Sequence, residues 1–170
     1  MMTIAGLACL SLCIFAALHD VATLKIPNWL NATIAGLGLS ALAVSGLPLT
    51  SIGWHGLVAL IAFIVSFGLF SFGVFGGGDA KMIPAVALWM GPVAIVPFLV
   101  WTAFIGGGIA LIGLAARYAP IPQAAPNWVA NTLSRGEGVP YGVAIAGGAL
   151  MAASHSPLLS APLGLIGLTH

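Results

Sequence analysis

Two aspartates, Asp20 and Asp79, are the side chains with the clearest capacity for chemistry. The chain has only three acidic residues in 170, and Asp79 directly follows a run of three glycines. Two carboxyl groups that face each other beside apolar walls cannot both ionise cheaply, so they tend to share one proton. One then serves as base and the other as acid, which together activate a water for attack on a peptide carbonyl. If the fold brings the two carboxyls together, the sequence predicts an aspartic protease site.

The composition indicates that these carboxyls belong to a membrane protein. The chain is 61% hydrophobic and 4% charged, whereas about 25% of residues in a soluble protein are charged. So few charges could not cover a soluble surface, so lipid must be the solvent for most of the chain. We expect an all-α, polytopic membrane helical bundle that forms a single integral-membrane domain over residues 1–170. The net charge of +1, with no basic cluster, argues against nucleic-acid binding.

Apolar segments separated by short polar, glycine-rich or proline-rich connections predict about six transmembrane helices. We expect them at residues 3–18, 27–47, 54–74, 80–92, 93–115 and 140–153. The first resembles a signal peptide, but no Lys or Arg precedes it and apolar segments continue after it, so we expect it to be retained. The polar stretch that follows the fifth helix should lie along the membrane interface, and the C-terminal tail should stay near the bilayer.

All the basic residues fall in the connections after the first, third and fifth predicted helices. They are Lys25, Lys81, Arg117 and Arg135. The positive-inside rule therefore places these connections, with both aspartates and Glu137, on the cytoplasmic side of the membrane. Both termini are then expected outside.

The neighbours of Asp79 allow a functional and a structural interpretation. Glycines at 76–78 could adopt backbone conformations closed to other residues and let a substrate strand pass close by, while Lys81 could hold one carboxylate ionised. Alternatively, Asp79 is only a helix N-cap and the lysines are topology anchors. We interpret His19 as an interfacial side chain. The sequence shows no ligand spacing for a metal, and nothing in it demands an organic cofactor.

Two motifs resemble the type IV prepilin peptidases, which are polytopic aspartic proteases of the GxGD class. One is Asp20 followed by KIPN at residues 25–28, and the other is GGGDAK at residues 76–81. The resemblance is closest to the short branch that serves Flp or tight-adherence pili, which residues 139–144 also resemble. Around the two aspartates, the motif residues are Lys25, Pro27, Asn28, Gly76, Gly77, Gly78 and Lys81.

The resemblance implies that Asp20 and Asp79 are the catalytic pair and that Gly76 and Gly78 fill the glycine positions of the motif. It implies a bacterial inner-membrane endopeptidase whose partners are the lipid bilayer and a prepilin. Such enzymes cut a short basic leader at the cytoplasmic membrane face, after a glycine and before a hydrophobic helix. Longer relatives also methylate the new N-terminus and carry paired CxxC motifs. This chain lacks those motifs, so we expect no methyltransferase activity. Presenilin-like proteases share GxGD but carry Tyr before the partner aspartate, where this chain has His19.

Two other functions stay open from the residues alone. A small proton-coupled transporter could use the same aspartates as ion sites, because membrane acids flanked by glycine-rich helices are typical of carriers. A scaffold subunit of a secretion assembly would need no chemistry. The sequence carries no signal for the oligomeric state.

Overall fold

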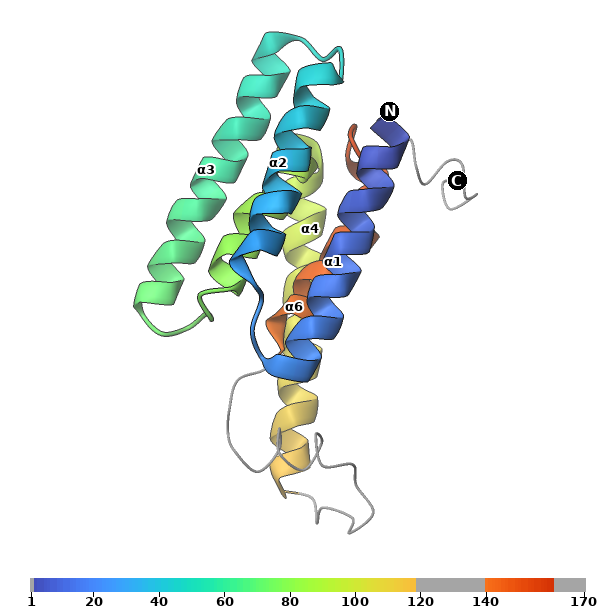
Figure 1. Ribbon diagram of the computed structural model, residues 1–170. Helices are drawn as coiled ribbons and strands as arrows, with labels where there is room; N and C mark the ends of the chain where they lie inside the picture. The colour runs from blue at the N-terminus through green and yellow to red at the C-terminus, as the bar shows by residue number, and fades with distance from the viewer. Residues whose placement is uncertain (1, 119–139, 161–170) are drawn as a thin grey trace.

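The computed structural model describes residues 2–118 and 140–160, and this part of the chain is all helical (Figure 1). Its elements are α1 (Met2–Thr23), α2 (Asn28–Val44), α3 (Leu49–Ser71), α4 (Asp79–Tyr118) and α6 (Tyr141–Ala152), followed by the 3-10 turn η1 (Ala153–His155). The predicted all-α class is confirmed. The predicted number of helices is wrong, because the described residues form five α-helices rather than six.

The predicted fourth and fifth helices form one element, α4, which bends at Gly91. This residue has φ +60° and ψ −168°, so the chain turns within one residue and leaves no connecting segment between the two arms. A Cβ here would overlap the ring of His55, so both the backbone angle and the close contact require glycine. Gly106 in the second arm lies against Tyr141, whose ring also packs on Phe75, just before α4. The second arm therefore returns to the end of the bundle where α4 began, as Figure 1 shows.

Three stretches are long and apolar enough to cross a membrane, namely Thr3–Thr23, Leu49–Ser71 and Asp79–Ala115. The remaining helices are shorter, since α2 has 17 residues and α6 has 12. At 1.5 Å per residue, α6 is about 18 Å long, against about 30 Å for a bilayer core. The helices are those of a membrane protein, but α6 is too short to cross the bilayer on its own.

The first helix is longer than predicted and carries His19 and Asp20 in its last turn rather than in a polar connection. The Thr23 hydroxyl donates to the carbonyl of His19 (2.8 Å), and the Leu24 N–H donates to the carbonyl of Asp20 (2.7 Å). Leu24 then ends the helix with φ +53°, a left-handed conformation common after a helix C-terminus. The connection to α2 shrinks to residues 24–27, so Asp20 sits on a rigid element.

Helix α6 lies between α1 and α4 and packs against both (Figure 1). Its buried residues are nearly all small: Gly142, Ala144, Ile145, Ala146, Gly148, Ala149 and Ala152. Small residues let helices approach closely in lipid, where no hydrophobic driving force pulls them together. A Cβ at Gly148, for example, would lie 2.9 Å from the carbonyl oxygen of Phe98 on α4. This close packing brings the N-terminus of α6 to the last turn of α1.

Pro84 and the turn at Gly91 explain how α3 is attached to α4. Pro84 lacks the N–H group that would bond to the carbonyl of Ala80, four residues earlier. The first arm ends at Gly91, so the carbonyl of Leu88 has no donor in the following turn of the same helix. Helix α3 contributes its only two buried side chains, both polar, to these two carbonyls. The Ser66 hydroxyl donates to the Ala80 carbonyl (2.8 Å), and His55 Nδ1 bonds to the Leu88 carbonyl (2.8 Å). The α3–α4 pair therefore fixes the first turn of α4, where Asp79 lies.

Candidate active site

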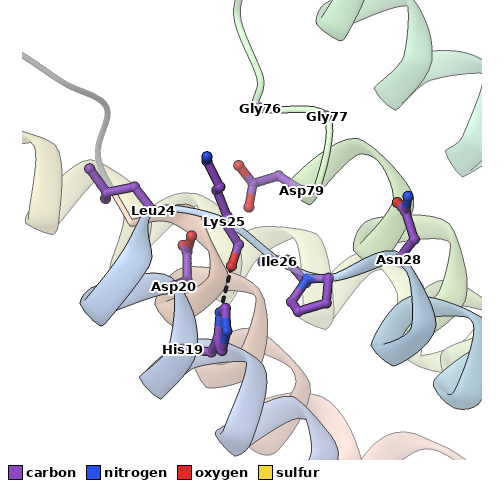
Figure 2. Close-up of a pocket in the computed structure, with 11 residues that line it drawn as sticks. His19, Asp20, Leu24, Lys25, Ile26, Asn28, Gly76, Gly77 and Asp79 are labelled. Carbon is purple, nitrogen blue, oxygen red and sulfur yellow. Dashed lines mark hydrogen bonds between the residues drawn. The ribbon is translucent and has the colours of Figure 1, made fainter.

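A pocket of about 480 Å³ lies where the α1–α2 connection meets the glycine run. It is lined by His19, Asp20, Leu24, Lys25, Ile26, Pro27, Asn28, Gly76, Gly77, Gly78 and Asp79. Every residue that the sequence singled out around the two aspartates lines this pocket, except Lys81. Figure 2 shows the carboxylates of Asp20 and Asp79 beside the same space, one from the end of α1 and the other from the start of α4.

Asp20 is held by the N-terminus of α6. Its side chain is buried, with 5% of the residue exposed, and Oδ2 accepts a hydrogen bond from the backbone N–H of Gly142 (2.8 Å). The first N–H groups of a helix have no intrahelical partner, and the helix dipole favours negative charge there. A Cβ at residue 142 would lie 2.9 Å from Oδ2, so only glycine allows this approach. Gly142 falls in the stretch 139–144 that resembles the family branch, but no role was predicted for it, because a backbone donor leaves no side-chain pattern.

Asp79 is the first residue of α4, but its side chain is not what caps the helix. Instead, the backbone N–H groups of Ala80 and Met82 donate to the carbonyls of Gly76 and Gly78, each at 3.0 Å. Oδ1 of the Asp79 carboxylate is buried and has no hydrogen-bond partner within the described residues. The structural alternative, in which Asp79 serves only as an N-cap, is therefore not supported.

The glycine run is needed for close packing rather than for unusual backbone angles. A Cβ at Gly76 would lie 2.9 Å from Asp79 Oδ2, and a Cβ at Gly78 would lie 2.9 Å from the Cβ of Ile26. Neither glycine has a positive φ, so the expectation of a glycine-only backbone conformation is wrong for these residues. The spacing Gly-x-Gly arises because the run is pressed between the Asp79 carboxylate and the α1–α2 connection.

Asn31 on α2 is a further residue that the sequence did not reveal. It is 5% exposed, and its Nδ2 donates to the carbonyl of Gly78 (3.1 Å), directly before Asp79. Its Oδ1 is buried without a partner in the described part of the chain. Asn31 therefore fixes the glycine run against α2. The only available signal was a polar side chain inside an apolar helical segment.

His19 and Thr23 hold the backbone of the α1–α2 connection. His19 Nδ1 donates to the Lys25 carbonyl (2.7 Å, Figure 2), and the Thr23 hydroxyl lies 3.2 Å from the same oxygen. The two side chains are one helical turn apart on α1 and contact each other at 3.0 Å. His19 was interpreted as an interfacial side chain, and the structure shows that it also shapes one wall of the pocket.

Lys81 lies outside the pocket, and its ammonium donates to Asn28 Oδ1 (2.8 Å). No group of three or more His, Cys, Asp or Glu side chains arranged to hold a metal occurs within residues 2–118 and 140–160. Arg135 and Glu137 fall outside the described residues, as does the stretch expected along the interface.

A family model described as the type IV leader peptidase family matches residues 7–111. The match covers more than half of the chain and includes both aspartates and the glycine run. The chain belongs to the type IV leader peptidase family. Searches of curated proteins and of solved structures found no match. Membership in the type IV leader peptidase family makes the chain a leader-peptidase-like protease of the membrane. Gly142 lies beyond the matched residues, so the role of α6 rests on its geometry.

Proposed function

We propose that this protein is an aspartic endopeptidase that removes the basic leader from Flp-like type IV prepilins at the cytoplasmic face of the inner membrane. The observation that carries the proposal is the placement of Asp20 and Asp79, from different helices, on one pocket. Lys25 and Lys81 lie at the same end of the bundle, and the positive-inside rule would turn that end towards the cytoplasm.

The surroundings of the two carboxyls suggest how they divide the work. Asp20 accepts a backbone N–H bond at a helix N-terminus, which favours its ionised form. The shared proton is then carried by Asp79, whose Oδ1 is buried and has no donor within the described residues. Asp20 is therefore assigned as the initial base and Asp79 as the initial acid.

In the first step, Asp20 takes a proton from water while the water oxygen attacks the carbonyl carbon of the scissile peptide bond. Asp79 donates its proton to the carbonyl oxygen, which gives a neutral tetrahedral diol. In the second step, Asp20 returns its proton to the amide nitrogen as the C–N bond breaks. Asp79 recovers a proton from a diol hydroxyl, so the pair ends as it began. This chemistry uses two carboxyls and water and requires no cofactor.

The position of the pocket favours proteolysis over proton-coupled transport. Asp20 lies in the last turn of α1 and Asp79 is the first residue of α4, whereas carriers place their ion sites near the bilayer midplane. The chain lacks the paired CxxC motifs that accompany methyltransferase activity in longer relatives, so we assign it cleavage alone.

The test is cleavage of an Flp-type prepilin by the purified protein in liposomes. Asp20→Asn and Asp79→Asn should each abolish cleavage, because either change removes one half of the acid–base pair, while both variants still insert. Glu137→Gln removes the only other carboxylate side chain and serves as the matched control, which should retain cleavage. Full activity in either aspartate variant would refute the proposal.

A further inference from the structure

A second groove, of about 550 Å³, runs between α2 and α3 over the first arm of α4, on which both helices pack. We call it the α2–α3 groove. It is lined by Asn28, Asn31, Ala32, Ala35, Leu39, Gly56, Ala59, Lys81, Pro84, Ala85 and Leu88. Asn28 lines the carboxylate pocket as well, so the two spaces meet at this residue.

The shape of this groove suits a helix. Small residues line much of the groove, and small residues let another helix approach closely within lipid. They are Ala32 and Ala35 on α2, Gly56 and Ala59 on α3, and Ala85 on α4. On α2 the lining extends from residue 28 to residue 39. That distance is about 16 Å, or three helical turns.

The polar groups of the groove lie at the end nearest the carboxylates. Asn28 and Lys81 are bonded to each other there. Asn31 is buried, with 5% of its surface exposed, and its Oδ1 has no hydrogen-bond partner within the described residues. The remaining lining residues are apolar or glycine. A helix beginning at this end would bring its unpaired first N–H groups to a region that holds an unpaired acceptor.

We propose that the α2–α3 groove binds the apolar helix that follows the scissile bond of the substrate. This inference rests on the proposed function, because a bond cut at Asp20 and Asp79 must be followed at once by a segment that enters the bilayer. The groove starts beside those carboxylates and leads along α2 into the apolar part of the bundle. The substrate helix would lie on the small residues with its N-terminus near Asn31.

A third cavity provides an internal control. It has a volume of about 430 Å³ and lies on the other side of α3, with Ala62 and Thr102 in its lining. It shares no lining residue with the carboxylate pocket. Phe75 and Tyr141, whose ring centroids are 5.3 Å apart, line this cavity at the pocket end of the bundle. A substrate helix in this cavity would have to begin behind that ring pair.

The first experiment compares Ala59→Phe with Ala62→Phe in the cleavage of membrane-anchored prepilin. Both alanines are half-buried on α3, one turn apart, and they face the α2–α3 groove and the control cavity respectively. Filling a matched surface costs about 1–3 kcal/mol. Cleavage below saturation should therefore fall by about 5- to 100-fold in Ala59→Phe and stay within about twofold of wild type in Ala62→Phe. Equal rates in the two variants would overturn the inference.

The second experiment needs no bulky substitution. The Asp79→Asn variant, which should bind prepilin without cutting it, carries a photoreactive amino acid at position 32. On illumination this amino acid should form a covalent adduct with the prepilin helix. The same probe at position 103, in the control cavity, should not. Adducts at position 32 only with lipid or with a second copy of this chain would contradict substrate docking.

The two proposals fail in different ways. If the wild-type protein does not cut prepilin at all, the proposed function is wrong and the groove loses its substrate. If the wild-type protein cuts prepilin but the position 32 probe never captures it, only the groove assignment is wrong.

Discussion

Gly142→Ala tests most directly how the site is built, because one added carbon meets the catalytic carboxyl itself. The new Cβ would lie 2.9 Å from Asp20 Oδ2, 3.0 Å from its Cβ and 3.2 Å from its Cγ. Approaches under 3.0 Å do not occur for real Cβ atoms, and the other two are also shorter than ordinary contacts. Asp20 or the start of α6 must therefore move by several tenths of an ångström.

The expected loss follows from the bond that this movement disturbs. The Gly142 N–H holds Asp20 Oδ2 at 2.8 Å, and a hydrogen bond to a charged group contributes about 1.5–3 kcal/mol. Losing it should lower kcat by roughly 10- to 100-fold, at about 1.4 kcal/mol per tenfold. The KM for prepilin should change little, because Gly142 lines neither the carboxylate pocket nor the α2–α3 groove.

The assay is prepilin cleavage in liposomes, with kcat and KM determined separately. Gly147→Ala on the same helix is the control, because the nearest atom to its added Cβ is the flexible end of Ile105 rather than a carboxylate. That variant should keep kcat within about threefold of wild type. A folded Gly142→Ala protein with wild-type kcat would show that the contact between α6 and Asp20 does not position the base.

Three further outcomes are expected. Asn31→Ala should lower kcat about three- to tenfold without loss of insertion, because a bond to the Gly78 carbonyl worth about 1 kcal/mol is removed; unchanged kinetics would argue against this role. Ser66→Ala should lower the free energy of unfolding, measured by thermal unfolding in detergent, by about 1–3 kcal/mol, because it leaves the Ala80 carbonyl without a hydrogen-bond donor. Adding Pro84→Ala, which restores an N–H for that carbonyl, should recover part of the loss, and additive losses would refute the explanation. Finally, the cleavage rate should fall on both sides of a pH optimum, since acid protonates both carboxyls and alkali ionises both; a single-sided profile would contradict the shared proton.

The pairing of the aspartates could be predicted from the sequence because the chain has so few acids. With three acidic residues in 170 and all basic residues in alternate connections, simple counting along the chain placed Asp20 and Asp79 at one membrane face. The structure brings them to one pocket. The catalytic role of the pair remains a prediction for the cleavage assay.

What the sequence could not supply was the support around those carboxyls. The Gly142 N–H is a backbone group, and the Asn31 bond joins residues 47 positions apart, so neither has a spacing to detect. The single bent helix α4 was also missed. The predicted boundary between residues 92 and 93 lies close to the break, but the structure turns at Gly91 within one continuous element. Pro84 does carry a signal in the sequence, because a proline inside a membrane helix frees a carbonyl that another helix must satisfy.

That exchange between α3 and α4 has a consequence for how the protein is made. Before α3 and α4 meet, the polar side chains of Ser66 and His55 and the carbonyls they bond to would face lipid without hydrogen-bond partners. Each unsatisfied group costs about 1–3 kcal/mol. We therefore expect that neither helix moves from the insertion machinery into the lipid by itself. The two should enter the bilayer as a preassembled hairpin, so biogenesis sets the first turn of α4 before the chain reaches α6.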